Sequence, residues 1–339
     1  MSNRNYFFYG LFTLLFVVQS VGCQTAGRQT DFIDAAIQRA DDDQHGFIQL
    51  CLPVGDRRIV AGPSKIERVQ RPMPPAARAF DNLYFVGNHW THAWAITTSD
   101  GIIILDAMDN DSDAQHIIAA GLIELGLDPK TIKYVIVSHG HSDHYGGTRY
   151  LQEVSGARIV MGEIDWQMIE AKKTFTPKPN RVAPPDRDIA VVPGDSIRLG
   201  DTRVELFSSP GHTLGTISPV FTVFDQGRPH RAMLWGGSSF NFGSSRPEQL
   251  DAYIDSTRRA IDYVRREGVD ILLSNHAIYD RSIDKLSAIS ATPDMPNPFI
   301  LGSEAVSNTL QVMDYCAQAT AEKWLQTHPK NPKAKQGAL

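Results

Sequence analysis

The chain has 339 residues, of which 42% are hydrophobic and 21% are charged, and its formal net charge is −5. A chain of this length and composition has room for one large α/β domain or two average domains with a sizeable core. The negative charge argues against a nucleic-acid partner, which normally requires a basic face. Beyond the amino-terminal run described next, no stretch is apolar for long enough to span a bilayer.

The amino terminus has the pattern of an export signal. Arg4 precedes an apolar run over residues 6–18, and small residues follow up to Cys23. We therefore expect residues 1–22 to be a signal peptide and the mature protein to be periplasmic or an outer-membrane lipoprotein. Ser20-Val-Gly-Cys23 resembles a lipobox, although a larger apolar residue is usual where Ser20 stands, so Cys23 is a candidate lipid anchor. The alternative is a retained membrane anchor, for which the run is short.

Residues 23–79 read as an irregular leader. Prolines interrupt most of it, and only residues 31–39 have the character of a short helix. Cys51 in the leader and Cys316 near the carboxyl terminus could pair in an oxidising compartment. The sequence is equally compatible with two separate buried thiols.

Residues 80–325 combine strand-like and helical patterns in one predicted domain. Runs of β-branched and aromatic residues bounded by turn residues predict strands at 82–86, 93–98, 102–106, 134–138, 158–161, 196–199, 203–208, 217–224, 232–235 and 270–275. Apolar residues at helical spacing predict helices at 114–125, 147–154, 163–172, 247–267 and 303–325. Two mixed sheets with helices outside are the natural layered arrangement, so the fold class is α/β. Residues 326–339 are rich in Lys and Pro and are expected to form a disordered tail.

The most informative segment follows the strand predicted at 134–138. Four side chains able to bind a metal, His139, His141, Asp143 and His144, occur there within six residues, with glycines that favour a tight loop. Imidazole and carboxylate are ordinary zinc ligands, and this number of groups suits two metal ions.

Two later histidines also follow predicted strands. His212 lies in a Pro-Gly-His-Thr turn after the strand at 203–208, and His276 directly follows the strand at 270–275. One sheet edge could therefore present all six groups together. His139, His141 and His212 would form one metal site, and Asp143, His144 and His276 would form the other, with Zn2+ as the expected metal and two ions per chain.

At these residues the chain resembles the metallo-β-lactamase superfamily, and it looks most like the third subgroup of the class B enzymes. The resemblance covers about residues 80–325 and rests on Tyr84-Phe-Val-Gly87, Asp100-Gly-Ile-Ile-Ile-Leu-Asp106, Ser138-His-Gly-His-Ser-Asp-His144, Pro210-Gly-His-Thr213 and Leu273-Ser-Asn-His276. It implies an αββα four-layer sandwich with a dinuclear zinc site in a groove. It also implies that Asp106 supports the metal loop by fixing the orientation of a histidine.

Two positions sort the branches of this superfamily. Many members supply a bridging aspartate where this chain has Ser238, and the lactamase subgroup also has serine there. Members that hydrolyse β-lactams often have Ser or Thr where this chain has Phe240, whose ring cannot donate a hydrogen bond to a carboxylate. Trp90, Trp166 and Phe240 are candidate walls of the substrate groove.

We therefore expect an exported zinc-dependent hydrolase that acts on a small-molecule carbonyl substrate, the amide of a β-lactam ring first. A hydroxide held by the two zinc ions would attack the carbonyl, Asp143 would orient it, and Ser238 would position water. One alternative is hydrolysis of another lactone, cyclic amide or ester by the same metals. The other is a non-catalytic zinc-binding exported protein.

Overall fold

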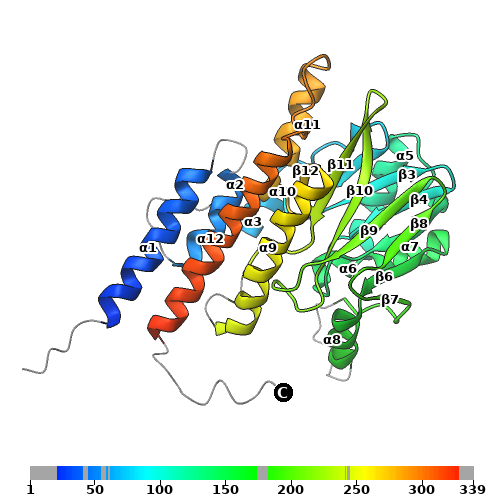
Figure 1. Ribbon diagram of the computed structural model, residues 1–339. Helices are drawn as coiled ribbons and strands as arrows, with labels where there is room; N and C mark the ends of the chain where they lie inside the picture. The colour runs from blue at the N-terminus through cyan, green and yellow to red at the C-terminus, as the bar shows by residue number, and fades with distance from the viewer. Residues whose placement is uncertain are drawn as a thin grey trace, which may run out of the picture.

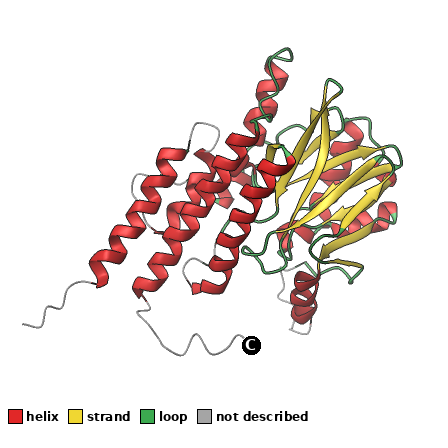
Figure 2. Cartoon of the chain, viewed as in Figure 1, coloured by secondary structure: helices red, strands yellow, loops and turns green. Residues whose placement is uncertain are grey.

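Two β-sheets packed face to face, with helices on both outer faces, form the centre of the molecule (Figure 1, Figure 2). The computed structural model describes residues 21–40, 45–54, 59, 62–173, 182–240, 242 and 245–327. The predicted signal peptide lies outside these residues apart from its last two positions, and the predicted tail lies outside them from residue 328 onward. Among the described residues, no helix is both long and apolar enough to cross a membrane.

The first sheet contains seven described strands, which lie in the order of the chain. They are β1 (Ala77–Phe80), β2 (Leu83–Gly87), β3 (His92–Thr98), β4 (Gly101–Leu105), β5 (Ile132–Ile136), β6 (Arg158–Gly162) and β7 (Ile189–Val191). Strands β1 to β4 pair antiparallel, whereas β4, β5, β6 and β7 pair parallel. The carboxyl ends of the parallel strands therefore lie at one edge of the sheet.

The second sheet has the strand order β12-β11-β10-β9-β8. Its members are β8 (Ser196–Leu199), β9 (Thr202–Ser208), β10 (Ile217–Asp225), β11 (Arg228–Trp235) and β12 (Val269–Ser274). Strand β10 is antiparallel to both β9 and β11, and β12 is parallel to β11. Strands β9, β11 and β12 therefore run in the same direction and end at one edge.

The helices cover the outer faces of the two sheets (Figure 1). The described helical segments are α1 (Val21–Arg39), α2 (His45–Ile48), η1 (Gln49–Val54), α3 (Lys65–Val69), α4 (Asp111–Asp113), η2 (Ala114–Ala119), α5 (Ala120–Glu124), η3 (Pro129–Thr131), α6 (Ser142–Tyr145), α7 (Thr148–Ser155), α8 (Glu163–Lys173), α9 (Pro247–Glu267), α10 (Ala277–Asp280), α11 (Ser282–Ala291) and α12 (Ser303–Thr327). Helix α12 packs against both α1 and α9, and the three run side by side in Figure 1.

Alternation along the strands explains why there are three apolar layers. In β4, Ile103 and Leu105 enter the core between the sheets, while Ile102 and Ile104 face the helices outside the first sheet. In β12, Leu273 enters the same central core, whereas Leu272 faces the helices outside the second sheet. Successive side chains of a strand point to opposite faces, so both faces of each sheet are apolar and covered. The predicted αββα sandwich is confirmed.

The segment expected to be irregular is partly helical. Helix α1 spans 19 residues and buries Ile33 and Ala36 in the layer that contains α12. Helix α3 begins with a capping box, in which the Glu67 amide donates to the Ser64 hydroxyl and the Ser64 amide donates to the Glu67 carboxylate. The prolines interrupt the segment but do not prevent α1, because α12 supplies an apolar surface that sequence periodicity does not reveal.

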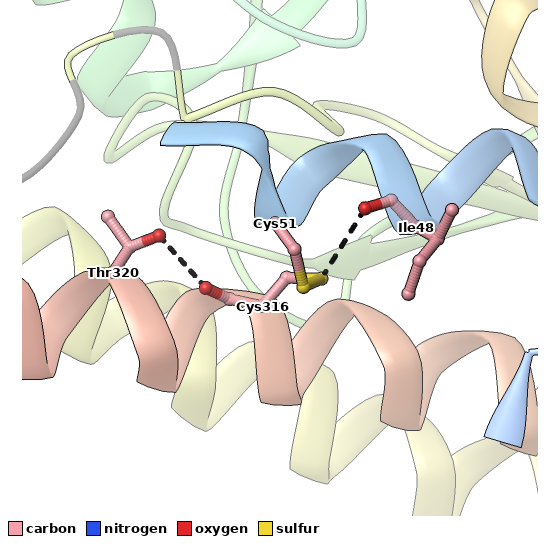
Figure 3. The surroundings of a disulfide bond; sticks show 4 residues. All are labelled: Ile48, Cys51, Cys316 and Thr320. Atoms are coloured by element: carbon pink, nitrogen blue, oxygen red, sulfur yellow. Dashed lines mark hydrogen bonds between the residues drawn. A yellow bond between two sulfur atoms is a disulfide. The ribbon is translucent and has the colours of Figure 1, made fainter. Parts of the chain in front are cut away.

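A disulfide joins this amino-terminal segment to the carboxyl-terminal helix (Figure 3). Cys51 lies in η1 and Cys316 lies in α12, and the two are 265 residues apart in the chain. Both side chains are fully buried. Of the two alternatives that the sequence leaves open, the structure therefore has the paired cysteines.

Loss of this disulfide is expected to destabilise the fold. Replacing Cys51 and Cys316 together with alanine should lower the free energy of unfolding by about 2 to 5 kcal/mol, because the crosslink constrains a long loop in the unfolded chain. Urea unfolding followed by circular dichroism measures this difference. Cys23→Ala, which removes the third cysteine, is the matched control, and an unchanged midpoint in the double variant would contradict the expectation.

Candidate metal centre

All six predicted ligands meet where strands of both sheets end. His139 and its neighbours follow β5, His212 follows β9, and His276 follows β12. The two sheets are joined at this edge by the amide of Ile217, which donates to the carbonyl of Ser138 at 2.9 Å. Two clusters result, and within each cluster the ligand atoms lie within 4.8 Å of one another.

The first cluster contains His139, His141 and His212. The Nδ1 atom of His139 lies 2.7 Å from the carbonyl oxygen of Gly236, and Nδ1 of His212 is hydrogen-bonded to the carbonyl of Ser239. A carbonyl oxygen can only accept, so the proton of each ring is on Nδ1 and the lone pair is on Nε2. Nε2 of His212 lies 3.0 Å from Nδ1 of His141. Nε2 of His139, Nε2 of His212 and a ring nitrogen of His141 together form one donor set.

The second cluster contains Asp143, His144 and His276. Nδ1 of His144 donates to the Asp106 carboxylate at 2.8 Å, and Nδ1 of His276 donates to the carbonyl of Trp90 at 2.7 Å. Both rings therefore carry their lone pair on Nε2. The Oδ2 atom of Asp143 lies 3.7 Å from the first of these Nε2 atoms and 3.8 Å from the second.

A buried carboxylate network holds the segments that carry these clusters. Asp106 is fully buried and accepts hydrogen bonds from the Ser138 amide at 2.7 Å, the Ser138 hydroxyl at 2.9 Å and the Asn275 side chain at 3.0 Å. The same Asn275 amide group donates to the carbonyl of Gly236 at 3.0 Å. With its bond to His144, Asp106 connects the ends of β4, β5 and β12. The predicted contact between Asp106 and the metal loop is present.

A second buried carboxylate connects the loop after β5 to the loop after β9. Asp165, in α8, accepts hydrogen bonds from the Gly140 amide at 2.7 Å, the Thr213 hydroxyl at 2.6 Å and the Gly215 amide at 3.1 Å. The sequence analysis did not identify Asp165 or Asn275. Asn275 had a signal, since it directly precedes His276 at a strand end, whereas Asp165 looks like any acidic residue in a first helical turn.

Close packing around His212 requires a glycine. A Cβ atom on Gly237 would lie 2.5 Å from Cβ of His212. The preceding carbonyl, that of Gly236, is the acceptor for both His139 and Asn275. The Gly-Gly pair after β11 therefore allows the backbone to approach two ligands at once.

The protonation states of these groups suit a metal cation. Burial lowers the pKa of His139 well below its ordinary value, and burial lowers the pKa of His212 and of His276 to about 4. Burial opposes ionisation of Asp143, but the adjacent His144 and His276 outweigh it and hold its pKa below the ordinary value. Three neutral imidazoles and a carboxylate are therefore available at neutral pH.

His144 has the opposite shift. Burial acts to lower its pKa, but the carboxylates of Asp143 and Asp106 outweigh burial and raise it. The pair of carboxylates thus favours positive charge at this position, which a metal ion on Nε2 would supply in place of a second ring proton.

The donor set fits a metal. Nε2 of His139 and Nε2 of His144 are buried and have no hydrogen-bond partner in the structure. A buried nitrogen without a partner is costly, so two of them at the centre of a six-ligand cluster are best explained as metal-binding atoms. The residues present therefore fit a metal, for which zinc is the typical choice with histidine and carboxylate ligands.

A cavity of about 510 Å3 opens above the clusters. His141, Asp143, His212 and His276 lie at its floor, and Trp90 forms part of its wall, as expected. The amino-terminal segment contributes five further lining residues, Gln49, Leu52, Gly62, Pro63 and Arg68. No sequence pattern pointed to a role for that segment in the site.

Two of the predicted groove residues lie elsewhere. Trp166 is fully buried behind the first sheet, and its indole nitrogen donates to the carbonyl of Ile189 at 2.9 Å. Phe240 is 1% exposed and packs edge-on against Tyr253 at 5.1 Å between ring centroids. The prediction that they wall the groove is therefore wrong, because both rings complete apolar cores.

Ser238 lies close to the centre but does not line the cavity. Its side chain is buried, and its hydroxyl oxygen has no hydrogen-bond partner in the structure. Its carbonyl accepts from the Tyr253 hydroxyl at 2.9 Å, while the neighbouring Ser239 lines the cavity. The catalytic role expected for Ser238 stays a prediction.

Comparison with known proteins agrees with this geometry. The family model described as the metallo-beta-lactamase superfamily matches residues 90–222. Residues 90–222 therefore form a metallo-beta-lactamase superfamily domain. Among solved structures, it is similar to BJP-1, a subclass B3 metallo-beta-lactamase of Bradyrhizobium japonicum, with a TM-score of 0.60 and 25% identity over 78% of this chain and 97% of that one. The FEZ-1 metallo-beta-lactamase of Legionella gormanii has the same fold, with a TM-score of 0.58 and 22% identity over 78% of this chain and 100% of that one.

Curated proteins of similar sequence have other names. A hydroxyacylglutathione hydrolase of Pseudomonas putida is 31% identical over 34% of this chain and 39% of its own length. The acyl-coenzyme A thioesterase MBLAC2 of Gallus gallus is 27% identical over 58% of this chain and 75% of its own length. The chain spans about two fifths of the length of the hydroxyacylglutathione hydrolases that it matches.

The hydrogen bond from His144 to Asp106 predicts a specific loss of metal affinity. In Asp106→Asn, the amide cannot accept from His144 and also keep its other bonds, so zinc affinity should fall by about 10- to 100-fold. Asn tolerates the backbone at this position, where φ is 63°. Competition with a chromophoric zinc chelator measures the affinity.

The matched control is Asp270→Asn. Asp270 also accepts a hydrogen bond from a histidine, His230, at a distance of 2.6 Å, but this pair belongs to neither metal cluster. Thermal unfolding of both variants distinguishes loss of metal affinity from loss of the fold. Wild-type zinc affinity in a folded Asp106→Asn protein would contradict the role assigned to Asp106.

Proposed function

We propose that the chain is an exported, zinc-dependent hydrolase that binds two zinc ions and cleaves a small-molecule carbonyl substrate, with the amide of a β-lactam ring as the first candidate. The observation that carries the proposal is the orientation of the histidines. His139, His144, His212 and His276 each have Nδ1 engaged by a protein acceptor, so their Nε2 lone pairs face the two clusters. Side chains that only pack or solvate would not share one such orientation.

The residues of the site divide the work of hydrolysis among them. Zinc, when bound, supplies a Lewis acid that polarises a carbonyl and lowers the pKa of water. Asp143 is ionised and 20% exposed at the cavity floor, so it can both bind the second cation and accept a hydrogen bond from attacking water. Asp106 keeps His144 in the required tautomer, as a carboxylate does behind a metal-bound histidine. The cavity walls limit the access of bulk water to the reacting groups.

Two substrate classes remain in competition. The likeness to subclass B3 structures over almost all of their length, together with Ser238 in place of a bridging aspartate, favours a β-lactam. The names of the curated relatives favour a thioester as the alternative. Both reactions attack a carbonyl carbon and suit the same pair of clusters.

Export is part of the proposal. The apolar run at residues 6–18 lies outside the described residues, but the buried bond between Cys51 and Cys316 supports an oxidising compartment. Lipidation at Cys23 is proposed with it.

Hydrolysis by the zinc-loaded protein is tested with a chromogenic cephalosporin and a hydroxyacyl thioester in parallel. Turnover of one of them is expected, and His139→Ala or Asp143→Asn should reduce kcat/KM by more than about 100-fold because each removes a ligand. A chelator should abolish turnover in wild type. Whichever substrate has the higher kcat/KM decides the class.

The control is His116→Ala, which removes an exposed histidine that lies in η2 and belongs to neither cluster. Turnover of neither substrate by zinc-loaded protein, or equal turnover in wild type and the ligand variants, would reject the proposed hydrolase and favour a non-catalytic zinc-binding protein.

A further inference from the structure

The amino-terminal segment places one permanent cation in the wall of the metal cavity. Arg68 is the single arginine or lysine among the described residues that line this cavity. It reaches the site from α3, in the segment that the disulfide at Cys51 fixes to α12. The fold therefore holds a guanidinium beside the ligands in addition to the six groups of the metal centre.

Most of the hydrogen-bonding capacity of this guanidinium is unused. The Nη1 group donates a hydrogen bond to the carbonyl of Pro63, whereas the buried Nε has no acceptor in the structure. Among the described residues, no carboxylate forms an ion pair with Arg68. An arginine presents five donors in a planar fork that matches a carboxylate or a phosphate, so the remaining donors suit an oxyanion.

Trp90 connects this guanidinium to the metal centre. The guanidinium carbon of Arg68 lies 4.7 Å from the centroid of the Trp90 ring, and that ring lies 4.7 Å from the ring of His276. Arg68 and His276, a ligand of the second cluster, therefore both pack against the Trp90 ring. An anion bound by Arg68 and a carbonyl at the clusters would belong to the same small molecule.

A neighbouring cavity of about 350 Å3 extends the positive surface outward. It shares Gln49, Pro63, Arg68 and Ile278 with the metal cavity. Arg71 and Arg281 also line it, and Asp284, the one acidic residue among the described residues of its lining, pairs with Arg281 at 3.2 Å. The charge therefore favours a negative group on the side of the site that faces Arg68.

We propose that Arg68 binds an anionic group, a carboxylate or a phosphate, on the substrate whose carbonyl lies at the metal centre. The proposal rests on the proposed hydrolase function and specifies its substrate class: the hydrolysed bond is joined to an acidic group. Because the guanidinium contacts the substrate and not the reacting carbonyl, its loss should weaken binding of anionic substrates and leave neutral ones unaffected.

Binding of three hydroxamic acids to the zinc-loaded full chain tests this without turnover. Succinohydroxamic acid and 3-phosphonopropionohydroxamic acid carry an anionic tail, and propionohydroxamic acid carries none. Isothermal titration should show that wild type binds at least one anionic probe about 10- to 100-fold more tightly than the neutral probe. The better anionic probe identifies the carboxylate or the phosphate as the natural group.

In Arg68→Gln this preference should disappear, while affinity for the neutral probe is unchanged. Arg68→Lys should keep part of the preference, because it retains the charge but not the fork. Lys65→Gln is the matched control: Lys65 also lies over the Trp90 ring, at 4.9 Å, but it pairs with Asp109 and lines neither cavity. A purely structural role for Arg68 would instead weaken all three probes equally.

Equal affinity of the three probes in wild type, or an intact preference in Arg68→Gln, would overturn the inference even if hydrolysis is present. A lost preference in Arg68→Gln would uphold it even if neither test substrate of the hydrolase assay is turned over. Failure of every hydroxamate to bind would overturn this inference and the proposed zinc site together.

Discussion

The structure depends on one buried carboxylate, that of Asp106. It accepts hydrogen bonds from the Ser138 backbone and side chain, from Asn275 and from His144, and so connects the ends of three strands from two sheets. A fully buried charge is stable only when its hydrogen-bonding capacity is used, and here the partners are the supports of the metal ligands. The hydrogen bonds that stabilise the buried Asp106 carboxylate therefore also position the metal ligands. A cation at the clusters would balance the charge of this carboxylate.

The layered fold and the ligand set could be predicted because they rest on local patterns. Alternating apolar residues give strands with two buried faces, and a histidine directly after such a strand must lie at a sheet edge. Helix α9 has the bounds that its sequence predicts, with a proline at its start and Gly268 after its end. The tautomers of the histidines could not be predicted, because they depend on the carbonyls of Gly236, Ser239 and Trp90, which come from distant segments.

The walls of the cavity depend on tertiary contacts that no local pattern carries. Trp166 and Phe240 are aromatic residues of the kind expected to line a groove. Both instead fill apolar cores, because neighbouring elements offer apolar surface to these rings. Conversely, Arg68 comes from a proline-rich segment with little periodicity, and the bond from Cys51 to Cys316 joins that segment to α12. The amino-terminal segment thus acts as part of the site and is not merely a connection to it.

The central claim is that six side chains hold two metal ions at the junction of the sheets. A crystal structure of zinc-soaked protein with anomalous data at the zinc edge tests it most directly. The account predicts two anomalous peaks, one coordinated by His139, His141 and His212, and the other by Asp143, His144 and His276. No peak at these side chains, or zinc bound only at other residues, would contradict it.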